Sequence, residues 1–313
     1  AYTTIDDPTI YFNTKLYTGT GSELAITGVG FQPDWVWSKN RDQSEGHRLF
    51  DSVRGATKFI RSNNSDAEGT AAQTLKSFDS DGVTIGTDAD MNTSSEKNVL
   101  WNWLAGGSAS SNSNGTITSS VSASTTAGFS VVSYTGTNNN QTVGHGLGAA
   151  PKVIILKNRS TTNNWCVGHG SLGFTKHLAL NETDAVGTSS VRFQDTAPTS
   201  TVYSVGAAGE TNGSGNSIIA YCFAEKKGYS KFGSYTGNDN ADGTFVYTGF
   251  APAWVMIKRT NSTNDWIILD TKRNPINPSD ERILANSSNA ASTANTMVDF
   301  LSNGFKPRST YGG

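Results

Sequence analysis

Apolar residues occur along this chain in short runs, each closed by a polar turn. Residues 35–39 (WVWSK) are typical, with aromatic and β-branched side chains followed by a lysine, and residues 153–157 (VIILK) repeat the pattern. Runs of this length, bounded by Gly, Asn and Ser, are typical of β-strands. Apolar spacing that suits a helix is confined to short stretches near residues 70–75 and 280–285. The pattern therefore predicts an all-β fold.

An aromatic turn recurs three times along the chain. It is Leu-Tyr-Thr-Gly at Tyr17 and Ser-Tyr-Thr-Gly at Tyr134 and Tyr235. The three tyrosines are 117 and 101 residues apart. A motif that returns at such a spacing predicts internal repeats, each of which would be one β-unit.

A second marker follows the first with nearly the same spacing. It is Gly-x-x-Pro directly before an apolar run, and its prolines, Pro33, Pro151 and Pro252, are 118 and 101 residues apart. Proline is tolerated at the start of a strand, because no ladder hydrogen bond is lost there. Trp35 and Trp254 open two of the strands that follow. Since the two markers share one period, we interpret the chain as three copies of a unit of about 100 residues.

The markers divide the chain into four segments. Residues 1–107 are predicted to form an N-terminal strand and a first β-sandwich, followed by a flexible or extended linker at residues 108–127, which are nearly all Ser, Ala, Thr, Asn and Gly. Residues 128–228 and 229–313 are predicted to form the second and third sandwiches, with jelly-roll-like connections. The third copy stops before the counterpart of residues 217–223, so we expect it to lack a final strand.

A sandwich without its final strand exposes an edge. The strand-like residues 9–12 (TIYF) precede the first copy. The main interpretation is a sandwich that tolerates the missing strand. Pairing of residues 9–12 with that edge or with a neighbouring chain is the alternative hypothesis.

Composition narrows the possible functions. Hydrophobic residues make up 35% of the chain and include seven Trp, so we expect thin sandwich cores with one face of each strand in water. The formal net charge is −2, which provides no basic surface for nucleic acid or an anionic membrane. No segment reaches the ~18 consecutive apolar residues of a membrane helix. The N-terminus shows neither the basic nor the apolar region of a signal peptide.

The candidate binding residues are three histidines and two arginines. His145 and His169 are flanked by glycines and lack the spacing of metal ligands, so we interpret them as loop histidines and predict no metal site. A metal site formed across loops is the alternative. His47, Arg48 and Arg54 belong to one polar and aromatic cluster (HRLFDSVRG), which is either a strand and turn with an arginine anchor or a loop that contacts a partner.

The sequence shows no catalytic arrangement. There is no Gly-x-Ser-x-Gly motif with triad partners, and Asp79-Ser80-Asp81-Gly82 is interpreted as a hairpin turn rather than a calcium loop. The paired tryptophans at residues 35, 37, 101 and 103 are expected to fill a core, with sugar stacking as the alternative. Cys166 and Cys222 are expected to be buried thiols, with a single disulfide as the alternative. We therefore predict no catalytic residues and no cofactor.

Several phrases of the first copy resemble virion structural proteins of marine and cyanobacterial bacteriophages. They are residues 1–19, 31–37 (FQPDWVW), 49–55 (LFDSVRG) and 78–82 (FDSDG). The later copies resemble the same proteins as diverged repeats, and the glycine-flanked histidines and the short third copy depart from them. The resemblance implies a tail-fibre-like or capsid-associated protein that is made in the host cytoplasm and located on the virion. It supplies no catalytic residues.

The sequence and this resemblance together predict a non-enzymatic virion protein on the particle exterior. It would be a tail fibre, a tail-associated protein or a capsid decoration that presents sandwich loops for assembly and host-surface contact. The expected partners are other virion proteins, further copies of the chain in a homo-oligomer such as a trimer, and host surface glycan. Nucleic-acid binding and membrane insertion are not expected. A free carbohydrate-binding lectin is the first alternative, and a glycan depolymerase with two carboxylates roughly 5–10 Å apart in a cleft is the second.

Overall fold

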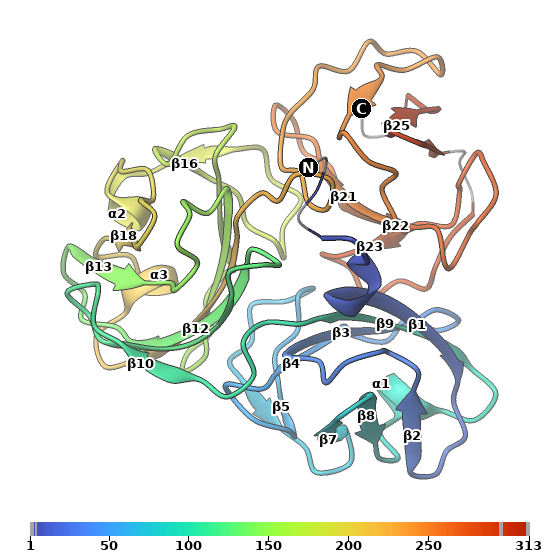
Figure 1. Cartoon of the computed structure of the whole chain (residues 1–313), viewed down its shortest axis with the longest axis horizontal. Coiled ribbons are helices and arrows are strands. Elements are labelled where there is room, and N and C mark those ends of the chain that lie inside the picture. Colours follow the sequence, from blue (N-terminus) through green and yellow to red (C-terminus); the bar gives the residue numbers. More distant parts are fainter. Residues whose placement is uncertain (1–2, 4, 294–296, 311–313) are drawn as a thin grey trace.

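The computed structural model describes residue 3 and residues 5–293 and 297–310. Within them nearly all regular structure is β-strand in antiparallel sheets, and the α-helices are three single turns of four residues each. This confirms the predicted all-β class. Figure 1 shows three lobes around a common centre. We call them lobe 1 (residues 5–107), lobe 2 (residues 108–228) and lobe 3 (the described part of residues 229–310).

Lobe 1 consists of two main sheets with a core between them. Its elements are a 3-10 turn (Pro8–Ile10), β1 (Phe12–Thr18), β2 (Leu24–Thr27), β3 (Trp35–Asn40), β4 (Arg48–Asp51), β5 (Lys58–Phe59), β6 (Gly69–Thr70), β7 (Leu75–Asp79), β8 (Gly82–Ile85), α1 (Ala89–Asn92) and β9 (Lys97–Trp103). The larger sheet has the order β1-β9-β3-β4 and the smaller has the order β2-β8-β7. Val36, Phe50 and Leu100 of the larger sheet meet Ile26 and Val83 of the smaller one.

Lobe 2 has the largest sheet of the molecule. Its elements are β10 (Ser110–Asn112), β11 (Ser119–Ser124), β12 (Phe129–Thr135), β13 (Gln141–Gly144), β14 (Val153–Asn158), β15 (Cys166–His169), β16 (Lys176–His177), β17 (Gly187–Thr188), α2 (Ser190–Phe193), β18 (Val202–Val205), α3 (Gly209–Asn212) and β19 (Ser217–Phe223). The main sheet has the order β10-β11-β12-β19-β14-β15, and β13 pairs with β18 opposite it.

The prediction of a linker at residues 108–127 is wrong, because this segment contributes β10 and β11 to the main sheet of lobe 2. Ile117 and Val121 enter the core of the lobe. The Ser119 hydroxyl, which is buried, donates to the carbonyl oxygen of Gly144 at 2.9 Å. Small polar residues therefore form strands here, because their backbones pair with neighbouring strands and two apolar side chains, Ile117 and Val121, are buried in the core.

Lobe 3 is built from fewer strands. They are β20 (Val246–Tyr247), β21 (Trp254–Lys258), β22 (Trp266–Asp270), β23 (Ile283–Leu284), β24 (Val298–Leu301) and β25 (Gly304–Pro307). One sheet has the order β21-β22-β23 and the other has the order β20-β25-β24. Among the described residues β21 is an edge strand, since only β22 pairs with it.

The alternative hypothesis that residues 9–12 pair with the edge of the third unit is wrong. Pro8–Ile10 form the 3-10 turn, and Phe12 opens β1, which pairs with β9 inside lobe 1. The ring contacts that reach lobe 3 are between side chains, with 6.3 Å between the centroids of Phe12 and Trp254 and 6.2 Å between those of Tyr11 and Tyr229. A proline and an Asp7 cap at the start of the segment favour the turn over an extended strand.

The lobes share a pattern of strand pairing. The order β1-β9-β3-β4 in lobe 1 matches β12-β19-β14-β15 in lobe 2, and the hairpins β3-β4, β14-β15 and β21-β22 correspond across all three lobes. The hairpin registers align Trp35 with Asp51, Val153 with His169, and Trp254 with Asp270. We use these registers to define equivalent positions. The interpretation as tandem copies and the jelly-roll connections remain predictions.

The central strands of the large sheets are buried on both faces. All residues of β3, β4 and β14 are buried, and the same holds for β22. Alternate side chains point into the lobe's own core or into a second core shared by the three lobes. The expectation that one face of each strand lies in water is therefore wrong for these strands, because a neighbouring lobe covers that face.

The shared core contains the predicted tryptophan pairs. Trp35, Trp37 and Trp101 are at most 1% exposed and Trp103 is 7% exposed. The Trp35 ring stacks on Tyr221 of lobe 2 with 4.3 Å between centroids. The tryptophans therefore fill a core, as predicted, and are not free to stack on a sugar.

The expectation for the cysteines is confirmed, whereas the expectation for the helical turns is wrong. Cys166 and Cys222 are buried free thiols, as expected, and burial raises the pKa of both. The expected helical turns near residues 70–75 and 280–285 are wrong, because the second stretch contains β23 and the first begins at the end of β6. The short helices α1, α2 and α3 instead precede β9, β18 and β19, respectively. Asp88 caps α1 by accepting from the amide of Asp90.

Candidate functional site

Three ring N–H groups at equivalent positions link the lobes into a closed ring. They are the rings of His47, Trp165 and Trp266, and their backbone carbonyl partners are those of Leu284 (3.0 Å), Arg61 (2.8 Å) and Ala179 (2.9 Å), respectively. Lobe 1 thus binds lobe 3, lobe 2 binds lobe 1, and lobe 3 binds lobe 2. In His47, Nδ1 accepts from the indole of Trp37 at 2.7 Å, so Nε2 carries the proton that is donated.

A second set of contacts repeats this cycle through the backbone. The amide and carbonyl pairs are Glu68 to Arg159 (2.9 Å), Val186 to Thr260 (2.8 Å) and Ala291 to Arg41 (2.9 Å). Lys157 adds a side-chain contact across one junction, since its ammonium donates to the carbonyl of Ser65 at 3.0 Å. Burial lowers the pKa of Lys157 to about 8. These contacts hold the three lobes as one body.

Two buried ion pairs stand at equivalent positions beside the shared core. Arg54 Nε lies 2.5 Å from Asp51 Oδ2, and Arg273 Nε lies 2.6 Å from Asp270 Oδ2. Each carboxylate also accepts a hydrogen bond from the neighbouring lobe. Tyr221 donates its hydroxyl to Asp51 at 2.8 Å, and the indole of Trp101 donates to Asp270 at 3.0 Å. Because Trp101 and Tyr221 are equivalent in β9 and β19, the final strand of one lobe completes the ion pair of the next.

Most of the predicted binding residues lie inside the molecule. His47 and His145 are fully buried, and Arg48 and Arg54 are each 5% exposed. His145 Nε2 lies 3.2 Å from the carbonyl oxygen of Thr199. The structure places these four side chains in the interior, and their assignment as binding residues remains a prediction. His169 is half-buried at the end of β15.

Arg48 lies within a group of acidic side chains at one edge of lobe 1. Its guanidinium is 2.6 Å from Asp90 and 3.5 Å from Asp88, and it lies 3.9 Å above the ring of Phe59. A hydrogen bond with Asp90 raises the pKa of Glu45, and burial raises the pKa of Asp88. This arrangement neutralises the carboxylates through Arg48 and caps α1.

Acid is expected to destabilise the fold through His47. Burial, together with the charge of Lys39, lowers the pKa of His47 to about 3, whereas an unfolded histidine has a pKa of about 6.5. The stabilising contribution is complete above pH 6.5 and is lost as the pH falls toward 3, because only the unfolded state binds the proton in that window. Going from pH 7 to pH 5 should cost about 2 kcal/mol of unfolding free energy through this residue.

Urea unfolding at both pH values measures this loss. His145, His169 and His177 also have lowered pKa values, so the comparison needs a His47→Gln variant. That variant should be less stable at pH 7 and should lose about 2 kcal/mol less than the parent on going to pH 5. Equal losses in the two proteins would contradict the assignment.

Lobe 3 carries an apolar surface that the other lobes lack. Among the described residues only six large hydrophobic side chains are exposed, and four of them belong to lobe 3: Phe245 (44%), Tyr247 (65%), Ile276 (72%) and Leu301 (36%). We call these four residues the apolar surface of lobe 3. Tyr247 and Leu301 both pair with Gly304 from opposite sides. The ring of Phe245 packs on Gly304, because a Cβ atom added to Gly304 would lie 2.9 Å from two carbon atoms of that ring.

The equivalent face of lobe 1 is polar. Gly82 corresponds to Gly304, and its two cross-strand neighbours are Thr27 and Asp79. Asp79 accepts hydrogen bonds from the hydroxyls of Ser77 and Thr84, each at 2.7 Å. An aromatic and an aliphatic side chain at the same two positions therefore distinguish this face of lobe 3 from the equivalent face of lobe 1.

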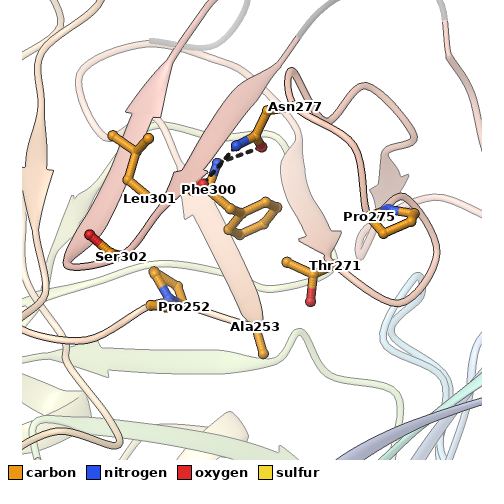
Figure 2. A pocket seen from close by; sticks show the side chains of 9 residues that line it. Pro252, Ala253, Thr271, Pro275, Asn277, Phe300, Leu301 and Ser302 are labelled. Carbon is orange, nitrogen blue, oxygen red and sulfur yellow. Dashed lines mark hydrogen bonds between the residues drawn. The ribbon is translucent and has the colours of Figure 1, made fainter.

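A shallow pocket of about 330 Å³ adjoins this surface. Figure 2 shows the Phe300 ring at its centre, with Pro252, Thr271 and Ser302 around it. The side chain of Asn277 is held by the backbone of Phe300, with bonds of 2.7 and 2.9 Å. The lining consists of uncharged residues only. It therefore fits an apolar side chain or a neutral hydroxylated group rather than an ion.

The described residues contain neither a cluster of metal ligands nor a membrane-spanning helix. No three His, Cys, Asp or Glu side chains are placed to hold a metal ion in the described part of the chain. None of the helices that the structure describes is long and apolar enough to span a bilayer.

The fold and this surface define an all-β protein of three interlocked lobes with one lobe-specific apolar face. The chain belongs to the family described as Domain of unknown function (DUF7483), which matches residues 7–313. Comparison with curated proteins and with solved structures found no match.

The residues of the apolar surface were not among the predicted site residues. A signal for one of them is present in the sequence, since the phrase FDSDG at residues 78–82 becomes FLSNG at residues 300–304. The exchange of Asp79 for Leu301 at a turn marks a lobe-specific apolar position. Tyr247 gives no comparable signal, because its counterpart Thr27 is revealed only by the strand register.

Proposed function

We propose that the protein is a non-enzymatic structural component of the exterior of a bacteriophage particle and that lobe 3 contacts its neighbour there. The observation that carries the proposal is the apolar surface of lobe 3, which replaces a polar face at the equivalent place in lobe 1. Contiguous exposed apolar side chains on a soluble body mark interaction sites. The closed ring of inter-lobe contacts gives this surface a rigid support.

The virion location is inferred from the resemblance of the first copy to phage structural proteins. In that setting the neighbours are other virion proteins or further copies of the chain, and repeated copies turn weak contacts into strong attachment. Immunogold microscopy of intact particles tests the location. We expect antibodies against the purified protein to label the outside of the particle. Particles that contain the chain only inside, or that lack it, would contradict the proposal.

Replacing the apolar surface with the residues of lobe 1 should weaken incorporation into particles. The double variant Tyr247→Thr and Leu301→Asp is expected to reduce the particle-bound protein about tenfold, because it removes the most exposed aromatic anchor and adds a charge. The amount bound per particle is measured by quantitative mass spectrometry after complementation of a phage that lacks the gene.

Val191→Thr is the matched control, since Val191 is 49% exposed but lies in lobe 2. We expect its incorporation to equal that of the parent. Both variants should unfold within about 0.5 kcal/mol of the parent, as surface changes do. Full incorporation of the double variant would show that lobe 3 is not the contact.

A free carbohydrate-binding lectin is the second candidate function. The uncharged pocket, whose lining holds the ring of Phe300 and the hydroxyl-bearing residues Thr271 and Ser302, favours it. Neutral sugars are bound by aromatic faces with a few polar groups. A glycan array with the purified protein separates the two functions, since strong binding to one glycan that the double variant loses would favour the lectin.

A further inference from the structure

Strand β21 of lobe 3 lacks a neighbour that its counterparts have. In lobe 1, β3 lies between β9 and β4, and in lobe 2, β14 lies between β19 and β15. The amide of Asp34 donates to Trp103 at 2.8 Å, and that of Lys152 donates to Phe223 at 2.6 Å. At the equivalent place the amide of Ala253 has no such acceptor among the described residues. One side of β21 is therefore an open edge.

In the other two lobes the final strand also pairs with a strand on its other side, and residues 231–236 are the counterpart of that strand in lobe 3. Residues 231–236 correspond to β12 and β1, because Tyr235 stands where Tyr134 and Tyr17 stand. Those strands pair with β19 and β9, whereas residues 231–236 form no strand. The edge of β21 and this segment thus flank the position that a final strand occupies in the other two lobes.

Side chains around the vacant place are incompletely buried. Trp254 and Met256 are half-buried, whereas their equivalents Trp35 and Trp37 are each 1% exposed. The indole Nε1 of Trp254 is buried without a hydrogen-bond partner, but so is that of Trp35, so the unpaired donor does not distinguish lobe 3. The incomplete burial of Trp254 and Met256 does, and the site favours an added group that shields these two apolar side chains.

The inter-lobe cycle is also incomplete at the same place. Tyr221 of the final strand of lobe 2 donates to Asp51 in lobe 1, and Trp101 of the final strand of lobe 1 donates to Asp270 in lobe 3. In lobe 2 the position equivalent to Asp51 and Asp270 is His169. A final strand in lobe 3 would contact it in the same way. Nδ1 of His169 accepts from the amide of Ser171 at 3.2 Å, so its Nε2 carries a proton, and no described residue accepts a hydrogen bond from it.

We propose that lobe 3 is a strand-acceptor site that binds a β-strand of a partner polypeptide, antiparallel to β21 and beside residues 231–236. β9 and β19 define the chemistry of the occupant. It has seven residues, with apolar or aromatic side chains at positions three, five and seven facing the shared core. Position five faces His169, where a tyrosine hydroxyl accepts the Nε2 proton. Backbone pairing at an open edge supplies affinity and the alternate side chains supply specificity. This proposal does not depend on where the protein is located.

A synthetic peptide with the sequence of β19 tests the site on the full chain. Its cysteine is replaced by serine, and two lysines are added for solubility. We expect saturable binding in NMR titrations, with shifts confined to β21, residues 231–236 and His169. A peptide with phenylalanine at position five should bind about fivefold more weakly, because one hydrogen bond is lost. A peptide with proline at position four should not bind, because its ring and missing N–H disrupt the added strand.

Variants of the protein complete the test. Met256→Arg is expected to weaken peptide binding at least tenfold, because it places a charge in the apolar floor of the site, while Val191→Arg on lobe 2 should leave it unchanged. The peptide comparisons keep the test valid if Met256→Arg fails to fold. No saturable binding up to about 1 mM, or shifts located elsewhere, would overturn the proposal. Concentration-dependent dimerisation that protects β21 without peptide would overturn it in favour of a second copy as the occupant.

Discussion

Replacing Arg54 by alanine is expected to lower the free energy of unfolding by about 3–5 kcal/mol. Arg54 and Asp51 have fully buried side chains 2.5 Å apart. Arg54 also donates to the carbonyl oxygen of Leu49 at 2.8 Å and lies 3.2 Å from Glu68. Its removal leaves the carboxylate of Asp51 in the interior without a cation, and only the hydroxyl of Tyr221 and the backbone amide of residue 54 still donate to it, each at 2.8 Å. The loss thus affects both lobe 1 and its junction with lobe 2.

Urea unfolding of the parent and the variant measures this effect. Arg273→Ala should cost a similar amount, because Arg273 makes the equivalent pair with Asp270. Lys76→Ala should change stability by less than about 0.5 kcal/mol, because its partner Glu23 and Lys76 itself are exposed. A double variant in which Ala replaces both Asp51 and Arg54 should lose less than the sum of the single variants. A loss below about 1 kcal/mol for Arg54→Ala would contradict the anchoring role.

The second large effect is expected at the centre of the molecule. Trp35→Ala should cost about 3–5 kcal/mol, because the indole is 1% exposed and its removal opens a cavity that the surrounding rings cannot fill. The indole lies 4.3 Å from Tyr221, 4.4 Å from Trp103 and 5.7 Å from Phe129, measured between ring centroids. Two of these rings belong to lobe 2, so the cavity weakens the contact between lobes as well as lobe 1 itself.

The same urea experiment checks this second effect. Trp35→Phe should lose less than Trp35→Ala, since a smaller cavity remains. Tyr247→Ala is the matched aromatic control, because Tyr247 is 65% exposed and should change stability by less than about 0.5 kcal/mol. Equal losses at Trp35 and Tyr247 would show that the shared core does not carry the stability we assign to it.

Much of the strand pattern could be predicted from sequence, because it depends on local chemistry. The glycine and proline before Trp35 and Trp254 place the starts of β3 and β21, which begin two residues after Pro33 and Pro252. The alternating tryptophans were correctly assigned to a core. Each of these inferences relies on neighbours within one strand or turn, where period and turn chemistry are informative.

The inter-lobe contacts could not be predicted in the same way. Trp165 donates to the backbone carbonyl of Arg61, which lies 104 residues earlier in the chain. Because every residue has a backbone carbonyl, the sequence does not indicate which one accepts this hydrogen bond. His47 and Arg54 belong to a polar cluster whose composition does not distinguish a buried junction from a surface loop. Residues 108–127 could not be recognised as strands, because serine-rich strands and serine-rich linkers have the same composition.

Cryo-electron microscopy of intact particles of a phage that encodes this chain tests the central claim most directly. Our account predicts three-lobed density on the particle exterior, oriented so that the apolar surface of lobe 3 meets a neighbouring protein. Density of this shape with lobe 3 facing solvent, or its absence from the exterior, would contradict the account.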